Sequence, residues 1–184
     1  ESCMCPPQLS FLVLLHQLLV HCSDPARLRC YCAATSLIQV RMAGFSAQEL
    51  SMLAVSLARL EYRPSDTWLD CFAAAAAAQM SNFEAQGLAN TLWALATLHY
   101  TPTEQWMNAF DTQLQQHLAS FTPAHTAMTM WAISRLEWLP EQPLWQQLQE
   151  RAELHTASYC SRSIRMMQRA IRVLEHVEAE DEQQ

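Results

Sequence analysis

The sequence predicts an all-α protein, a short α-solenoid in which helix pairs of one fixed length stack on one another. The 184 residues include only two glycines, Gly44 and Gly87, and they lack the Val-, Ile- and Thr-rich runs that are typical of strands. Aromatic residues also recur every 38 positions, at Phe45, Phe83, Phe121 and Tyr159. A two-helix unit of this length cannot bury its own apolar face, so neighbouring units must stack.

Each unit is predicted to contain two helices. Apolar residues follow helical spacing in the first half, and a proline at the same place in each unit ends that helix or opens the next. These prolines are Pro64, Pro102 and Pro140. Trp68 and Trp106 recur near the start of the second helix, where we expect both side chains to be buried.

Capping residues indicate where the helices start. Ser46 with Glu49 matches a capping box, and Thr122 before Pro123 places a hydroxyl cap before a proline in the first turn. At the second helix, Thr101 precedes Pro102 in the same manner. Negative charge in its first turn is favoured by the helix dipole, and it is supplied by Asp66, Glu104 and Glu141.

The register predicts a single solenoid domain spanning residues 1–184. Residues 1–44 form a degenerate helix pair, which is followed by repeats at 45–82, 83–120 and 121–158, a terminal helix at 159–179 and an acidic tail at 180–184. We expect about nine helices. The apolar stretch Phe11–Val20 has no polar capping repeat before it, so we expect neighbouring protein subunits to cover the ends of the array.

Several functional classes are disfavoured by composition. Phe11–Val20 is much shorter than the roughly 20 residues of a membrane span, so no membrane association is expected. The seven histidines show no metal-ligand spacing, and a glycine-rich phosphate loop is missing. The seven cysteines favour reduced thiols, and the Cys-x-Cys pairs argue against the alternative of a zinc site. We therefore expect no enzyme activity, no cofactor, no metal and no small-molecule substrate.

The segment Leu88–Trp106, LANTLWALATLHYTPTEQW, resembles the octotricopeptide repeat family of green-algal organelles. Units of that family have 38 residues, a first helix like Trp-Ala-Leu-Ala and a motif like Pro-Pro-Pro-Glu-Trp. Here the motif stands as Pro102–Trp106 and Pro64–Trp68, whereas Leu144 replaces the tryptophan in the third unit. The resemblance covers residues 45–158. It implies RNA binding in a chloroplast or mitochondrion, in transcript stability, splicing, translation or ribosome assembly.

The first helices offer a candidate RNA-binding face opposite their apolar stripe. Single-stranded RNA is bound by amides, arginines and aromatic rings, which read base edges, pair with phosphates and stack on bases. The residues predicted to do so are Gln48, Arg59, Gln86, Asn90, Trp93, Trp131 and Arg135. An alternative for Trp93 and Trp131 is that they pack against neighbouring repeats.

A row of four arginines on the terminal helix is a second candidate. We name it the arginine stripe: Arg162, Arg165, Arg169 and Arg172. Their spacing places them on one face, opposite Ile164, Met167, Ile171 and Leu174, so we predict that they contact RNA phosphates. The alternative is a solvated face paired with Glu175 and the acidic tail.

Together these patterns predict an RNA-binding repeat protein that holds a single-stranded or structured RNA segment. With so few repeats, we expect a subunit of a larger ribonucleoprotein, such as an organellar ribosome, in the mitochondrial matrix or the chloroplast stroma. The formal net charge of −7 opposes phosphate binding. It favours the alternative of a protein-protein interaction scaffold that binds a partner subunit or peptide in its groove.

Overall fold

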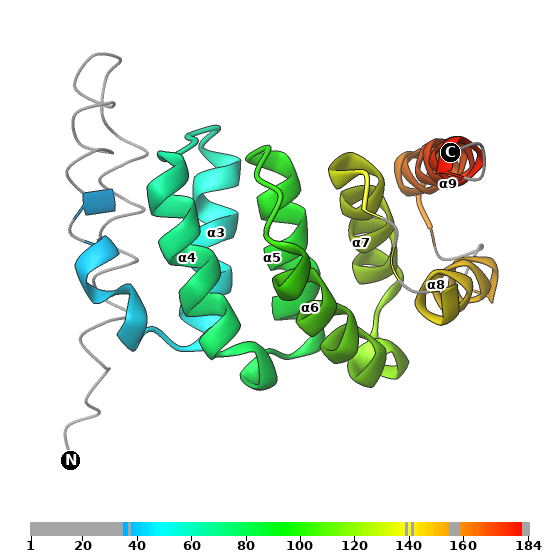
Figure 1. Ribbon diagram of the computed structural model, residues 1–184. Helices are drawn as coiled ribbons and strands as arrows, with labels where there is room; N and C mark the ends of the chain where they lie inside the picture. The colour runs from blue at the N-terminus through cyan, green and yellow to red at the C-terminus, as the bar shows by residue number, and fades with distance from the viewer. Residues whose placement is uncertain (1–34, 37, 139, 141, 155–158, 182–184) are drawn as a thin grey trace.

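The computed structural model describes residues 35–36, 38–138, 140, 142–154 and 159–181. Within these ranges the chain is built from helices without a β-strand, which confirms the predicted all-α solenoid. The helices follow one another in a row from α3 to α9 (Figure 1). Most of the expected helix pair in residues 1–44, including Phe11–Val20, lies outside the described residues. Its described end is helical at 38–41 and closes in the 3-10 turn η1 (Met42–Gly44).

Helix boundaries repeat with the period of the sequence. The first helices of successive units are α3 (Ala47–Arg59), α5 (Ala85–Thr97), α7 (Pro123–Leu136) and α9 (Ser161–Asp181). The second helices are α4 (Asp66–Ala78), α6 (Glu104–His117) and α8 (Gln142–Leu154). Two further 3-10 turns, η2 (Met80–Asn82) and η3 (Leu118–Ser120), lead from a second helix into the next unit. Each type of helix therefore begins every 38 residues from α3 to α8.

The predicted caps of the first helices are confirmed in α3 and α7. Ser46 Oγ accepts from the Glu49 backbone N–H at 3.3 Å, and Glu49 Oε2 accepts from the Ser46 N–H at 2.9 Å. Thr122 Oγ1 accepts from the His125 N–H at 3.3 Å, and His125 Nδ1 accepts from the Thr122 N–H at the same distance. Both boxes satisfy backbone donors that a helix start leaves unpaired.

The sequence allowed the second helices to begin at their prolines, but in the structure they begin two residues after them. Ser65 and Thr103 are the caps of α4 and α6, so the expected cap at Thr101 was wrong. Pro102 is buried in the connection and neither ends nor opens a helix. The reason is the burial of Trp106, whose backbone N–H donates to Thr103 Oγ1 at 3.4 Å and so fixes the helix start at Glu104. Asp66 and Glu104 occupy first turns as predicted, whereas Glu141 lies outside the described residues.

The terminal helix also differs in its bounds from the expected 159–179. Tyr159 is buried before the helix, which begins at Ser161. The helix continues to Asp181, two residues into the segment expected as an acidic tail.

A left-handed residue follows each of the first helices α3, α5 and α7. These residues recur every 38 positions, at Glu61 (φ 53°), His99 (φ 54°) and Glu137 (φ 52°). The next backbone N–H then reaches back to a carbonyl of the last turn, from Tyr62 to Leu57 and from Tyr100 to Leu95 at 3.1 Å, and from Trp138 to Ile133 at 3.2 Å. This is the Schellman pattern, formed without the glycine that usually supplies the positive φ.

The first helices form one tightly packed layer. α5 lies directly against α3 and α7, and α7 lies against α9, whereas α4 and α6 touch at few places. Fully or almost fully buried alanines, among them Ala54, Ala89, Ala96 and Ala127, allow this close approach. We call α3, α5, α7 and α9 the first-helix layer, and α4, α6 and α8 the second-helix layer.

Equivalent aromatic residues occupy equivalent places in the core. Phe45, Phe83 and Phe121 are all buried, and so are Trp68 and Trp106, as predicted. The Trp68 indole N–H donates to the Thr35 carbonyl at 2.9 Å, and the Trp106 indole N–H donates to the Ala73 carbonyl at 3.0 Å. In the third unit Leu144 is fully buried at the tryptophan position, and the Arg151 guanidinium donates to the Ala119 and Phe121 carbonyls at 3.0 and 2.7 Å. Each unit is thus joined to the one before by a side-chain donor on a backbone carbonyl.

Candidate nucleic-acid interface

A groove of about 790 Å³ lies between the N-terminal halves of α3 and α5. We call it the amide groove, because its lining includes Gln48, Gln79, Asn82, Gln86 and Asn90. Met52 adds an apolar wall and is 38% exposed. The groove brings together three of the sequence-predicted residues, Gln48, Gln86 and Asn90, from two successive repeats.

The start of α5 is built differently from the starts of α3 and α7, and it lines this groove. Glu84 stands at the cap position that Ser46 and Thr122 occupy in the flanking repeats, and Gly87 stands where Glu49 and His125 close their boxes. The structure describes every residue at the start of α5. There the Glu84 side chain forms no capping hydrogen bond with the helix. Sequence reasoning did not single out Glu84, although the missing cap pattern could be read from the aligned repeats.

The remaining predicted residues of the first three repeats lie elsewhere on the same layer. Trp93 and Trp131 are half-buried and pack against the core. This agrees with the alternative that they pack against neighbouring repeats, although part of each side chain remains accessible. Arg59 and Arg135 are exposed in the last turns of α3 and α7, at the other ends of the helices from the amide groove. Arg135 Nη2 lies 3.4 Å from both ring nitrogens of His99, so the guanidinium lies against the imidazole.

Two groups near these helix starts and ends have shifted pKa values. Burial lowers the pKa of His125, which favours the neutral imidazole that accepts from the Thr122 N–H. Burial, followed by the hydrogen bond to Asp70, raises the pKa of Tyr100, so its hydroxyl remains a donor.

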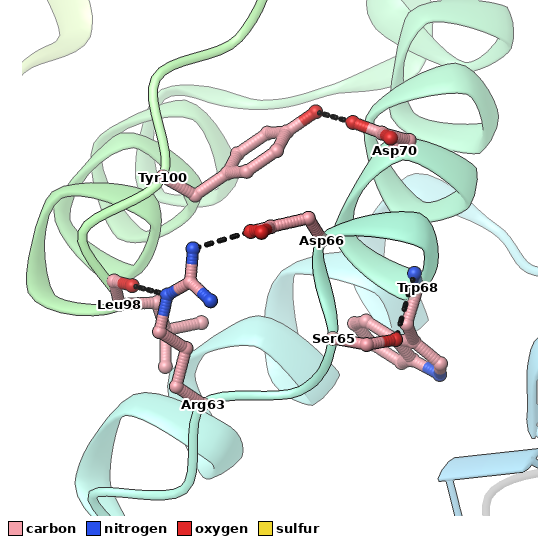
Figure 2. Close-up of polar contacts among 7 residues, drawn as sticks. All are labelled: Arg63, Ser65, Asp66, Trp68, Asp70, Leu98 and Tyr100. Carbon is pink, nitrogen blue, oxygen red and sulfur yellow. Dashed lines mark hydrogen bonds and ion pairs between the residues drawn. The ribbon is translucent and has the colours of Figure 1, made fainter.

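Polar contacts between the first two units use residues that sequence analysis did not identify (Figure 2). Arg63 Nε donates to the Leu98 carbonyl at 2.8 Å, and its guanidinium also pairs with Asp66. The Tyr100 hydroxyl donates to Asp70 Oδ1 at 2.8 Å. Arg63 and Tyr100 are thereby committed to holding α4 and the end of α5 together, so we assign them no role in binding.

The arginine stripe lies on the outward side of α9. Arg165, Arg169 and Arg172 are exposed, while Met167 and Ala170 are buried on the side that packs against α7. The backbone of Arg162 belongs to α9, but its side chain lies outside the described part of the chain. Within that part, Arg63 pairs with Asp66, and no ion pair of Arg165, Arg169 or Arg172 is seen.

Comparison between repeats shows how unusual the stripe is. Two repeats earlier, the position of Arg165 is occupied by Ala89 and that of Arg172 by Ala96, both fully buried. The positions that bury alanine in α5 therefore carry exposed arginines on α9.

Charge is divided between the two layers. The second helices carry six acids and only one arginine, Arg151. The first helices α3, α5 and α7 carry Arg59 and Arg135 but a single acid, Glu49, which is used in the capping box. On α9 the four arginines precede its four acids. The second helices therefore carry the larger part of the negative charge of the repeats, while Glu61, Glu84 and Glu137 add acids at the ends of the first helices.

The described residues contain no group of three or more metal-ligating side chains. No helix among them is long and apolar enough to span a membrane.

Residues 34–137 match the family model of the Tbc2 translation factor, N-terminal domain. This is more than half of the 184 residues. The chain belongs to this family. The description of the family names a translation factor. A comparison with curated proteins found no match.

The Tbc2 match covers α3 to α7, and the amide groove lies wholly inside it. Helices α8 and α9, with the arginine stripe, lie beyond it. The groove therefore lies inside the part of the chain that matches the Tbc2 family model, and the stripe lies outside that part.

Proposed function

We propose that the chain is a non-catalytic RNA-binding protein of organellar translation, built from repeats of the octotricopeptide type. It holds an RNA segment on its first-helix layer as a subunit of a larger ribonucleoprotein in a mitochondrion or a chloroplast. The observation that carries the proposal is the amide groove, which gathers Gln48, Gln86 and Asn90 from two repeats. Membership of the Tbc2 family supports the link with translation.

The lining of the groove suits an unstacked nucleobase. Side-chain amides offer a donor and an acceptor side by side, which is the pattern that base edges present. Met52 supplies an adaptable apolar wall against which a flat ring can lie. No arginine lines the groove, so phosphates would remain outside it.

The distribution of charge supports this placement. RNA affinity depends on cations near phosphates, and an acidic surface repels the backbone. The first-helix layer has Arg59, Arg135 and the arginine stripe, whereas most of the acids of the repeats lie on the second helices. An RNA strand that follows the first helices would avoid the acidic layer.

A protein-binding scaffold is the second candidate, and one feature favours it. A groove of about 430 Å³ between α4 and α6 is lined mainly by apolar side chains, including Ala74, Ala77 and Trp106. It lies on the acidic second-helix layer, where RNA would be repelled. The two functions use opposite layers, so the same chain can bind RNA on one and a protein on the other.

The test of RNA binding is a pair of matched triple variants. One replaces Gln48, Gln86 and Asn90 by Ala. The control replaces the same residue types at exposed positions of the second-helix layer, Asn108, Gln116 and Gln147. Affinity for a single-stranded RNA pool is measured over a series of salt concentrations.

We expect the groove variant to bind RNA at least tenfold more weakly, at roughly 1 kcal/mol per lost hydrogen bond. The control variant should bind as the unmodified chain does. If the unmodified chain shows no salt-dependent RNA binding, or if both variants weaken it equally, the proposal is wrong and the scaffold function gains support.

A further inference from the structure

The groove of about 430 Å³ between α4 and α6 has a lining made mainly of small apolar side chains. We call it the alanine groove, after Ala73, Ala74 and Ala77 of α4 and Ala109 of α6. Ala74, Ala77 and Ala109 are exposed to solvent. The groove forms because α4 and α6 touch at few places and their facing side chains are short. It leaves an apolar surface open between two helices.

The following second helices show that this surface is not needed to build a repeat. The positions of Ala74 and Ala77 carry exposed polar side chains there, Thr112 and Gln115 in α6 and Glu150 and Glu153 in α8. Helix propensity does not require the alanines either, because Gln and Glu are almost as good helix formers as Ala. In α4 alone of the three helices, these positions stay short and apolar.

One end of the alanine groove is negatively charged. Asp70 and Tyr100 line this end, and the Tyr100 hydroxyl donates to Asp70 Oδ1 at 2.8 Å (Figure 2). Glu104 stands between Thr103 and Gln105, which also line the groove. Asp70 and Glu104 are exposed, and neither α4 nor α6 contains a lysine or an arginine. Charge complementarity therefore favours an occupant that carries positive charge.

The lining also favours a helix over an extended peptide. Alanine methyl groups offer no hydrogen-bond partner, and a buried backbone group without a partner is costly. A helix pairs its own backbone groups and can place an apolar face in a groove between two other helices. On α4 the lining extends from Asp70 to Ala77, which spans roughly 10 Å and matches about two turns of a bound helix.

We propose that the alanine groove binds a basic amphipathic helix of a partner protein. Its apolar side chains lie against Ala74, Ala77 and Ala109, and its lysines or arginines lie near Asp70 and Glu104. The proposal rests on the scaffold function named above as the second candidate, and it adds the chemistry of the partner. RNA binding is independent of it, because the alanine groove and the amide groove belong to different layers.

Three synthetic peptides of about 18 residues, a length at which isolated helices can form, test the chemistry of the occupant. The first has leucine and alanine on one helical face and lysine on the other. The second has glutamate in place of lysine, and the third has the residues of the first in an order without an apolar face. Affinity for the full chain is measured by fluorescence anisotropy at about 150 mM salt.

We expect the first peptide to bind on the order of tenfold more tightly than either of the others, because it alone combines the apolar face with positive charge. Equal binding of the first and third peptides would mean that charge alone attracts them, and it would overturn the proposal. Preference for the glutamate peptide would overturn it as well.

Two neighbouring alanines provide a matched pair of variants. Ala77→Gln introduces the residue that α6 has at the same position, and it should weaken the first peptide on the order of tenfold, since the added side chain takes up room in the groove. Ala78→Gln is the control, because Ala78 is exposed on the same helix but does not line the groove. It should change the affinity by less than about twofold. Equal affinities of the two variants would show that the peptide binds elsewhere.

The charges are tested by a double variant, Asp70→Asn with Glu104→Gln, which keeps the shape of the groove. It should weaken the first peptide by roughly two- to fivefold for each charge removed and reduce the salt dependence of binding. Glu150→Gln, which removes an exposed acid from α8, is the control and should leave both nearly unchanged. If the double variant binds as the control does, a basic partner is excluded.

Measurements on the same variants distinguish other occupants. Ala77→Gln should leave RNA affinity unchanged, and a loss equal to that of the peptide would make RNA the occupant and overturn the proposal. A dimer of the unmodified chain that Ala77→Gln dissociates would make a second copy the occupant, with the same consequence. If the chain binds RNA but not the first peptide, the proposal fails and RNA binding stands. If it binds the peptide but no RNA, the proposal stands and RNA binding fails.

Discussion

The arginine stripe gives a prediction whose size can be worked out from the structure. Arg165, Arg169 and Arg172 are exposed on the outward face of α9. If each contacts one phosphate of a single strand, replacing all three by Gln removes three contacts. The slope of log K against log salt should then fall by about 2, at roughly 0.7 per contact, and adding Arg162→Gln extends the change to about 3.

The assay is RNA affinity between about 50 and 200 mM salt, a fourfold range. Over this range the affinity of the triple variant should drop on the order of tenfold less than that of the unmodified chain. The loss should be similar for every RNA sequence, because phosphate contacts carry no base information. Gln is almost as good a helix former as Arg, so the melting temperature should not change.

Arg63→Gln is the control, because this arginine is already held by Asp66 and the Leu98 carbonyl. It should leave the salt slope unchanged. An unchanged slope in the triple variant would refute the reasoning, and it would leave the stripe as a solvated terminal face.

Three further predictions concern stability. Trp106→Ala should lower the free energy of unfolding by about 3 to 5 kcal/mol in urea titrations, because a buried ring and its bond to Ala73 are lost; a loss below about 1 kcal/mol would contradict its burial. Glu137→Gly should raise that free energy by roughly 0.5 to 1 kcal/mol, since it relieves a left-handed backbone and removes a carboxylate from a helix C-terminus; destabilisation would mean that the carboxylate has a partner. The lowered pKa of His125 means that the unfolded chain binds a proton more readily, so stability should be full above about pH 6.5 and fall as pH decreases. His125→Gln, which can still accept from Thr122, should flatten this dependence in melting curves, and an unaltered profile would exclude His125 as its source.

The period of the sequence was sufficient to predict most of the fold. Phe45, Phe83 and Phe121 recur without an insertion, so each residue type could be assigned to one place in a two-helix unit. Their equal burial follows because stacked units give equivalent residues equivalent neighbours. Tryptophans at the start of the second helix were predictable for the same reason.

Element boundaries were less predictable where two local signals competed. Thr101 and Thr103 both have hydroxyl side chains suited to capping a helix that follows Pro102. Local propensity does not choose between them. The choice depends on the burial of Trp106 against the preceding unit, which is a tertiary contact.

The candidate site was predicted in part. Gln48, Gln86 and Asn90 were found from their angular position on a helix, and they do line one groove. Angular position does not tell how far apart two helices lie, so Arg59 and Arg135 were grouped with them although they occupy the opposite helix ends. The groove itself results from the distance between α3 and α5, and no single-helix pattern contains that distance.

The hydrogen bonds of the two tryptophans affect how the sequence of such a repeat protein can change during evolution. Trp68 and Trp106 each bind a main-chain carbonyl of the preceding unit, at Thr35 and Ala73. A carbonyl is present whatever side chain occupies the position, so mutation of the accepting residue does not remove the partner. Substitutions in the helix that supplies the carbonyl therefore leave this hydrogen bond, and with it the angle between neighbouring units, unchanged. Residues facing the groove can then be exchanged one repeat at a time, and the spacing between repeats is inherited unchanged.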